Sequence, residues 1–355
     1  MKRIWLWLAV IFQVAVVTWM AVQREWVLAT GEVVWLRTAP LDPRDIFRGD
    51  YVELDYDVSI LAADQQSQEI QEGDKPERGD RVYVSLVTGA GELAETGMMT
   101  LEPPSSGLYL KGRIKQDWRF GESRAQRVKY GIEKYFVEQG TGWELEKRRG
   151  ARGQVQVPME MEVALSAGGL AVIKGHRWSR LGIQLKRLEE RPPEMEMGQS
   201  LDTPGDNETS TQDEVVAGSP AEPPAAAILE LVLKNVSQQP LALALLPDNC
   251  SFSVKTTKWA PRQMILNQER CAAYAGASAE IRVLQAEEEY QIFYDFNDPQ
   301  WLVEEDGKLV SIDSLQWNQQ FRIIYRPPQV ESPDGVDVWR GYLPSPSFNG
   351  GGRVD

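Results

Sequence analysis

The chain has 355 residues with ordinary hydrophobic (42%) and charged (25%) fractions, which predicts two folded units rather than one. Its formal net charge of −14 argues against binding of nucleic acid or anionic membranes by the bulk of the chain, since both need clustered Lys and Arg. We therefore expect no nucleic-acid partner and a well-solvated acidic surface.

The N-terminus predicts a membrane anchor. Residues 4–22, IWLWLAVIFQVAVVTWMAV, carry no formal charge, and as a helix they span about 28 Å, close to a hydrocarbon core of about 30 Å. Lys2 and Arg3 favour a cytoplasmic start. The length favours an uncleaved anchor, whereas a signal peptide cleaved near Val27–Ala29 is the alternative. We expect residues 1–29 to be a cytoplasmic stub and single-pass anchor in the inner (cytoplasmic) membrane, with the C-terminal bulk in the periplasm or outside.

Composition divides the rest of the chain into two β-rich modules. Residues 30–188 consist of short alternating apolar and polar runs bounded by turn residues, which predicts a barrel-like β-domain. Residues 189–225, rich in Pro, Ser, Thr and acids, predict a flexible linker. Alternating Leu, Val and Ile over 226–348 predict an immunoglobulin-like β-sandwich, followed by a disordered tail at 349–355. The expected fold is therefore mainly β.

One short helix is expected in the first module, because Thr141 and Glu144 match a capping box for GWELEKRR. The block around it, Val128 to Glu146, interleaves aromatic residues with charge. We expect these aromatic side chains to form a small core rather than a carbohydrate or nucleic-acid platform; they are Tyr130, Tyr135, Phe136 and Trp143.

The two cysteines, Cys250 and Cys271, form a candidate disulfide, because both lie in the exported part of the chain. Twenty residues lie between them, and on the loop-entropy model a bridge would contribute about 3 kcal/mol. His176 is the only histidine, so an N/S zinc site cannot be assembled without carboxylates. We expect neither a metal nor a cofactor.

Arg-Gly-Asp occurs twice, at 48–50 and at 78–80, and each copy is followed by apolar residues that alternate in the same phase. Gly permits an unusual turn angle and Asp can accept backbone amides, so Gly-Asp is interpreted as a strand start rather than an adhesion signal. Carboxylates two residues apart on the first strand would stand about 6.6 Å apart, too far to share a calcium ion comfortably. A solvated strand face is the preferred interpretation for Glu53, Asp55 and Asp57.

Gly49, Asp50, Tyr51, Leu54 and Tyr56 match the pattern G-D-Y-x-x-L-x-Y. With the flanking segments LRTAPLDPRDIF, VKYGIEKYFVEQGTGWELE and LAVIKG, they make the first 188 residues resemble the GDYXXLXY family of bacterial membrane-anchored proteins. The resemblance implies a single anchor and an extracytoplasmic β-rich domain with no assigned activity, so the five positions are signature residues only. It also implies a multi-pass membrane protein as partner.

The chain shows no nucleophile pattern around His176, no Walker loop and no G-x-G-x-x-G. We therefore expect a non-enzymatic, membrane-anchored envelope protein that acts as a scaffold or binding partner of a membrane protein. Asp50 is predicted to bind backbone amides, and Leu54 and Tyr56 to fill the core. The alternatives are a Ser/Lys peptidase similar to bacterial signal peptidases, with Ser59 as nominal nucleophile, and a periplasmic glycan- or ligand-binding module.

Overall fold

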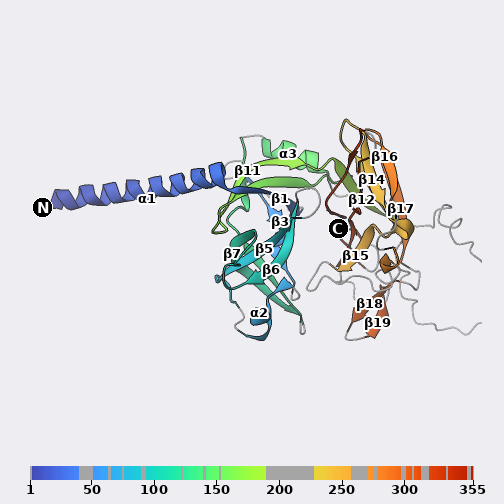
Figure 1. Ribbon diagram of the computed structural model, residues 1–355, viewed down its shortest axis with the longest axis horizontal. Helices are drawn as coiled ribbons and strands as arrows, with labels where there is room; N and C mark the ends of the chain where they lie inside the picture. The colour runs from blue at the N-terminus through green and yellow to red at the C-terminus, as the bar shows by residue number, and fades with distance from the viewer. Residues whose placement is uncertain are drawn as a thin grey trace, which may run out of the picture. The chain divides into compact units, whose positions relative to one another are not determined.

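The computed structural model describes most of the chain, which divides into two units (Figure 1). The first unit is Met1–Ala151 with Gln156–Arg180, and the second is Arg152–Val155 with Leu181–Asp355. Each unit is mainly β, as predicted. The described residues are 2–39, 51–62, 65–73, 76–88, 93–120, 123–138, 141–151, 153–188, 228–256, 271–274, 278–296, 301–305, 308–312, 320–332, 335–349 and 353–354.

Helix α1 (Lys2–Thr30) contains the predicted anchor and continues eight residues beyond it. Its apolar side chains are exposed over most of its length, but Val27, in the last turn, is buried with Ala164 and Val172. The helix ends at Gly31, whose amide donates to the carbonyl of Val27 at 2.8 Å. A Cβ at this glycine would lie 2.5 Å from that same carbonyl oxygen and 2.9 Å from the carbonyl oxygen of Leu165 in the sheet, so only glycine fits the close approach of helix and sheet.

The first unit contains two main antiparallel sheets and several short elements. One sheet has the order β11-β10-β1-β3 and the other the order β4-β8-β7-β5-β6, while β2 pairs with β9. Alternate residues of the long strands point into one core, as period-two patterning requires. The strands are β1 (Glu32–Ala39), β2 (Tyr51–Glu53), β3 (Asp55–Tyr56), β4 (Ile60–Leu61), β5 (Arg81–Thr88), β6 (Ala94–Thr100), β7 (Tyr109–Phe120), β8 (Ser123–Lys129), β9 (Lys134–Phe136), β10 (Met159–Leu165) and β11 (Ala171–Trp178).

The described part of this unit also contains two further helices and the 3-10 turn η1 (Asp57–Ser59). Helix α3 (Thr141–Arg149) confirms the helix expected from GWELEKRR, whereas α2 (Gln68–Glu72) was not predicted. The first strand expected around Glu53, Asp55 and Asp57 is instead broken into β2, β3, the turn η1 and β4. The reason is that its three short strands pair with three different strands: β2 with β9, β3 with β1, and β4 with β8.

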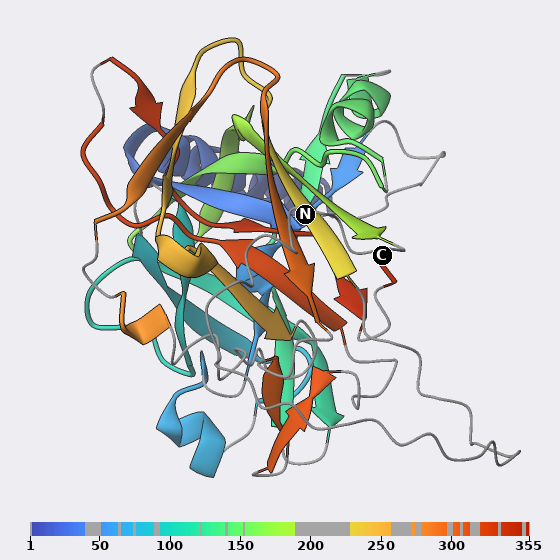
Figure 2. The same cartoon turned by 90° about the vertical axis from the view of Figure 1, so that its right-hand side faces the viewer.

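The strands of the second unit form four small sheets, of orders β12-β13-β17, β16-β14-β21, β15-β20-β22 with β23 on β20, and β18-β19 (Figure 2). This confirms a mainly β unit, and the immunoglobulin-like arrangement stays a prediction. The strands are β12 (Leu181–Leu188), β13 (Ile228–Asn235), β14 (Leu241–Leu245), β15 (Phe252–Thr256), β16 (Glu280–Leu284), β17 (Glu289–Asp295), β18 (Leu302–Glu305), β19 (Lys308–Ser311), β20 (Gln320–Tyr325), β21 (Asp337–Val338), β22 (Leu343–Pro344) and β23 (Phe348–Asn349).

The boundary between the units differs from the predicted one. Strand β12 was expected to end the first module at residue 188, but it pairs with β13 along its whole length and belongs to the second unit. The predicted linker at 189–225 lies outside the described residues. The tail was expected to be disordered, yet Val354 forms an antiparallel bridge with Phe348, and the amide of Asn349 donates to the carbonyl of Arg353 at 3.1 Å.

The second unit has a core rich in aromatic side chains and contains the predicted disulfide. Phe252 and Tyr325 stack with ring centroids 4.9 Å apart, and Phe296 packs edge-on against Trp301. Cys250 and Cys271 are bonded, with their Cα atoms 5.3 Å apart. The bridge joins the segment before β15 to a distant point of the chain, which the spacing of the two cysteines permitted but could not establish.

Candidate functional site

The G-D-Y-x-x-L-x-Y signature, residues 49–56, lies partly in the core of the first unit. Leu54 and Tyr56 are buried, as predicted, and the hydroxyl of Tyr56 donates to the carbonyl of Ile132 at 2.8 Å. Burial, with the nearby Glu133 carboxylate, raises the pKa of Tyr56 far above its ordinary value, so the phenol stays neutral. The backbone of Tyr51 pairs with Phe136. Gly49 and Asp50 lie outside the described residues.

The second Gly-Asp turn can be followed completely and confirms the strand-start interpretation at that copy. Gly79 has a φ of 100°, and the carboxylate of Asp80 accepts the amide of Glu77 at 2.8 Å. The amide of Asp80 donates back to the carbonyl of Glu77 at 3.0 Å, and β5 begins at the next residue. Glycine supplies the left-handed angle and aspartate closes the turn. Arg78-Gly79-Asp80 is therefore the structural start of β5.

Ser59, the nominal nucleophile of the peptidase alternative, is 1% exposed in η1. A nucleophile must reach a substrate carbonyl, so this burial removes the basis for assigning Ser59 that role. The only histidine, His176, has Nδ1 3.1 Å from the Tyr135 hydroxyl and packs edge-on against Trp178. Burial, and secondarily the charge of Arg148, lower the pKa of His176. Its neighbours here are aromatic and basic rather than a nucleophile.

The other predicted groups are placed individually. Asp55 forms an ion pair with Arg127 of β8, so its expected role on a solvated strand face is wrong. Tyr130 is buried, with its hydroxyl donating to the carbonyl of Val58 at 2.6 Å, as a core residue would. Phe136, however, is 72% exposed, because β9 presents it on the outer face of its short pairing with β2. The side chain of Trp143 lies outside the described residues.

A feature that the sequence reasoning missed is a shallow concavity of about 750 Å³ on the sheet of β5, β7 and β8. We call it the basic groove. It is lined by six basic side chains and a single carboxylate, that of Glu133. The six are Arg78, Arg81, Lys111, Arg113, Lys115 and Lys129.

The strand register explains how these cations come together. Arg81 of β5 lies directly opposite Arg113 of β7, and Arg113 lies directly opposite Lys129 of β8. Within β7, Lys111 and Lys115 flank Arg113 at two-residue spacing, which places all three on one face. The side chains of the row Arg81, Arg113 and Lys129 are exposed. The intervening residues of these strands point into the core.

Hydrogen bonds to the backbone hold the edge of the groove. Arg113 donates from Nη1 to the carbonyl of Gly79 at 2.7 Å, which ties the Gly-Asp turn to β7. Glu133 accepts the amides of Tyr130 and Gly131 at 2.5 and 3.0 Å, so its carboxylate closes the turn after β8. Within the part of the chain that the structure describes, none of the six groove cations forms an ion pair with a carboxylate.

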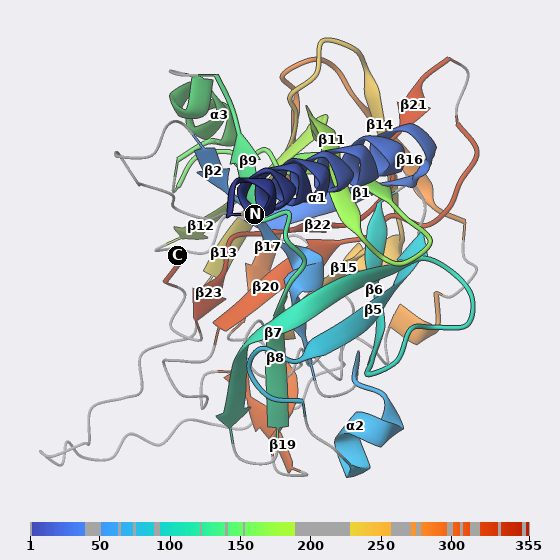
Figure 3. The ribbon, with the colours of Figure 1, turned by 90° about the vertical axis from the view of Figure 1, so that its left-hand side faces the viewer.

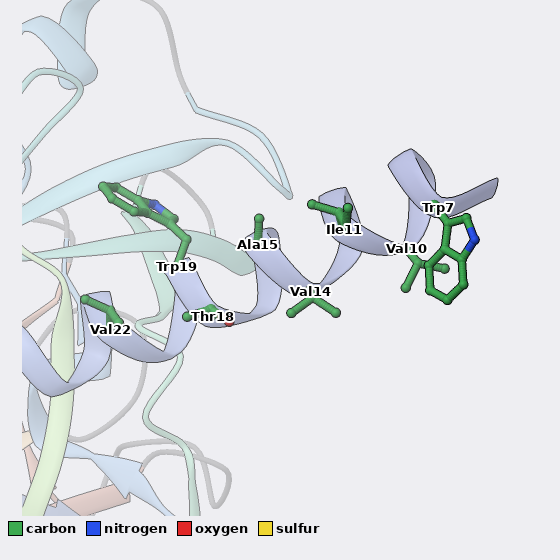
Figure 4. Close-up of a pocket in the computed structure, with 8 residues that line it drawn as sticks. All are labelled: Trp7, Val10, Ile11, Val14, Ala15, Thr18, Trp19 and Val22. Carbon is green, nitrogen blue, oxygen red and sulfur yellow. The ribbon is translucent and has the colours of Figure 1, made fainter. Parts of the chain in front are cut away.

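The exposed surface of α1 is the second candidate site. The length and hydropathy of Trp7–Thr30 are sufficient for a membrane span, although a signal sequence meets the same criterion. Along one face of this helix runs a groove lined by eight side chains, with Trp7 toward one end and Trp19 and Val22 toward the other (Figure 4). Val14, Ala15 and Thr18 lie between the tryptophans, so the middle of the face is formed by smaller side chains.

Neither candidate surface carries a cluster of metal ligands among the described residues. Across the described ranges, no group of three His, Cys, Asp or Glu side chains lies close enough together to hold a metal ion. The basic groove can hold an anion by charge, and the face of α1 can pack against lipid or another helix.

Residues 13–175 match the model of a family described as GDYXXLXY protein. This confirms the family predicted from the signature, and this part of the chain belongs to it. The match runs from the middle of α1 through most of β11, whereas the main part of the second unit, Leu181–Asp355, lies outside it. Comparison with curated proteins and with solved structures gives no match to the chain.

Proposed function

We propose that this protein is a non-enzymatic, single-pass membrane protein whose GDYXXLXY-type unit is held at the bilayer by α1 and scaffolds a multi-pass membrane protein. The observation that carries the proposal is the dual nature of α1. Its apolar surface is exposed through the length of a bilayer core, while its last turn packs in a small apolar cluster with β10 and β11 of the folded unit.

The last turn of α1 supports an uncleaved anchor over a signal peptide. Val27 is 3% exposed and packs with Ala164 of β10 and Val172 of β11. Cleavage after Ala29 would remove Val27 from this cluster and leave an apolar hole in the unit, at an expected loss of about 1–3 kcal/mol. We place the bulk of the chain outside the cytoplasm, in the periplasm, because Lys2 and Arg3 precede the helix.

The groove on α1 supports a helix as the partner within the membrane. Trp7 and Trp19 are separated by about 18 Å along the helix axis, and the smaller side chains between them would let a second helix approach closely (Figure 4). In lipid there is no hydrophobic force between helices, so association depends on such fitted surfaces. The second unit, which we propose to be an immunoglobulin-like sandwich, would provide further protein contacts outside the bilayer.

The proposal is tested by photo-crosslinking from single positions of α1 in intact membranes. A photoreactive amino acid replaces Val14, which lines the groove, or Val16, which lies two residues away and faces the opposite side of the helix. The expected result is one defined crosslinked protein from position 14 and none from position 16.

The matched positions have the same residue type and nearly the same depth, so the comparison separates a specific face from general proximity. Equal crosslinking from both positions, or none from either, would overturn the proposed partner helix. Release of the chain from membranes by alkaline carbonate would overturn the anchor itself.

A further inference from the structure

We infer that the basic groove binds the phosphate-bearing headgroups of anionic phospholipids in the bilayer that α1 spans. This inference rests on the proposed membrane anchor and adds a second, electrostatic contact with the same membrane. The charge of the groove is opposite to that of the chain as a whole, whose formal net charge is −14. The net charge argues against binding of anionic membranes by the bulk of the chain, but this argument does not apply to the basic face.

The groove lies next to the end of the anchor. Leu170, the residue before β11, lines the groove and also packs against the small cluster that contains Val27 of α1. The turn that carries Leu170 is bonded directly to β7, because the amide of Lys111 donates to the carbonyl of Gly169 at 2.9 Å and the hydroxyl of Tyr109 donates to the carbonyl of Ala167 at 2.9 Å. These contacts fix the groove beside the last turn of α1.

The strands that line the groove lie on the side of the first unit from which α1 projects. Figure 3 looks along α1 from its N-terminal end and shows β5, β7 and β8 on that side. Trp26, one residue before the buried Val27, is 69% exposed. A tryptophan at this position belongs at the level of the lipid headgroups, and the adjacent groove then lies at the same level.

The charge pattern of the groove also points to an anion. Like charges directly opposite each other on neighbouring strands destabilise a sheet. Arg81, Arg113 and Lys129 form such a row across three strands, and no carboxylate in the described part of the chain pairs with them. A headgroup phosphate placed over the row would remove this repulsion and accept charge-assisted hydrogen bonds from the guanidinium groups.

The openness of the site favours lipid over a small enclosed ligand. The groove is shallow, and its row of cations is exposed and spread over several strands, so it cannot surround one small anion. Several phosphates in a plane match this arrangement, and basic residues near an anionic membrane surface attract it within a Debye length.

The experiment uses the full chain in nanodiscs of phosphatidylcholine, with or without about 30 mol% phosphatidylglycerol. Lysine acetylation by a water-soluble reagent is measured at each site by mass spectrometry. Lys111 and Lys129 are expected to be labelled at least about threefold more slowly when phosphatidylglycerol is present, and about 0.5 M NaCl should remove the protection. Lys308, exposed in the second unit, should be labelled at the same rate in both nanodiscs.

A matched pair of variants tests the groove itself by retention of phosphatidylglycerol on the detergent-purified protein. Lys111→Gln with Lys129→Gln should lower the retained lipid at least about threefold, whereas Lys308→Gln with Arg340→Gln, which changes the net charge equally, should leave it unchanged. Both sets replace exposed side chains.

The other outcomes of these experiments separate a failure of the headgroup inference from a failure of the proposed anchor. A chain that stays in the membrane while Lys111 and Lys129 gain no protection overturns the headgroup inference and leaves the anchor intact. Extraction of the chain from native membranes by carbonate would instead overturn the proposed membrane anchor. Protection of both lysines by about 10 mM inorganic phosphate in pure phosphatidylcholine nanodiscs would show a site for free phosphate and overturn the assignment to lipid.

Discussion

Two groups of basic side chains in the first unit differ in how their charge is balanced. On the sheet of β1, β10 and β11, the carboxylate of Glu160 binds Arg37 at 2.7 Å and Arg177 at 2.8 Å, and both Arg37 and Glu160 are buried. Arg177 also lies over the ring of Trp35, 3.9 Å from its centroid. In the basic groove, by contrast, the row of cations lies on an exposed face without a paired carboxylate among the described residues.

The difference separates a structural role from a binding role. A buried charge without a partner is strongly destabilising. The ion pairs of Glu160 therefore have a structural role, because they neutralise charges that the fold buries. Arg113 of the exposed row binds the carbonyl of Gly79, but no carboxylate among the described residues offsets the repulsion between the facing cations, so the fold gives no electrostatic reason for their register. Their arrangement is explained by an anion from outside the chain.

The largest expected effect is from Glu160→Gln. This change leaves the Arg37 guanidinium buried without its counter-charge and should lower the free energy of unfolding by about 3–5 kcal/mol. Urea unfolding of the full chain in detergent, followed by tryptophan fluorescence, measures it. The matched control is Glu162→Gln in the same strand, whose 3.4 Å pair with Lys174 is partly exposed and should contribute at most about 1 kcal/mol. Equal losses for the two variants would remove the contrast.

A smaller effect of opposite sign is expected from Lys129→Gln. In detergent without anionic lipid, removal of one cation from the row should raise the free energy of unfolding by about 0.2–1 kcal/mol, since it relieves repulsion with Arg113. The gain should decline as salt is added, because salt screens exposed charges. Lys308→Gln serves as the control and should show no such gain. A loss of stability in Lys129→Gln would mean that this side chain is a packing residue of the sheet.

The smallest expected effect on stability comes from His176, which lies in β11, in the same sheet as Glu160, and near Arg148. Burial lowers its pKa in the folded chain, so below pH 6.5, its ordinary value, the unfolded chain binds a proton first. Stability should therefore fall slightly as the pH decreases from 6.5 to about 5. His176→Gln should remove this part of the pH dependence. The measurement is the difference in the free energy of unfolding between the original chain and the variant at each pH. An unchanged difference across the range would show that His176 does not titrate differently in the two states.

Much of the architecture could be predicted from the sequence because its signals are local. The uncharged run at 4–22 predicted α1, alternating apolar residues predicted a mainly β chain, and turn chemistry predicted the start of β5 at Gly79-Asp80. The signature positions Leu54 and Tyr56 were placed in the core by the same alternation. Each of these features depends on residues within a few positions of one another.

Strand pairing decided the features that the sequence did not reveal. The segment from Tyr51 to Leu61 alternates like one strand, yet it bends because its pieces find three different partners. Likewise, β12 belongs to the second unit because β13, far along the chain, supplies its hydrogen bonds. Alternation determines which face a residue occupies but not which strand lies beside it.

The basic groove likewise depends partly on a local sequence signal and partly on the pairing of strands that are distant in the chain. The spacing of Lys111, Arg113 and Lys115 was enough to place three cations on one face of a strand, and this was the signal that could have indicated the groove. The sequence by itself thus determined a long apolar N-terminal helix, two β-rich modules and the orientation of side chains within each strand. Only the tertiary structure brought Arg81 and Lys129 to either side of Arg113 and set this row beside the end of α1, because both depend on contacts between residues distant in the chain.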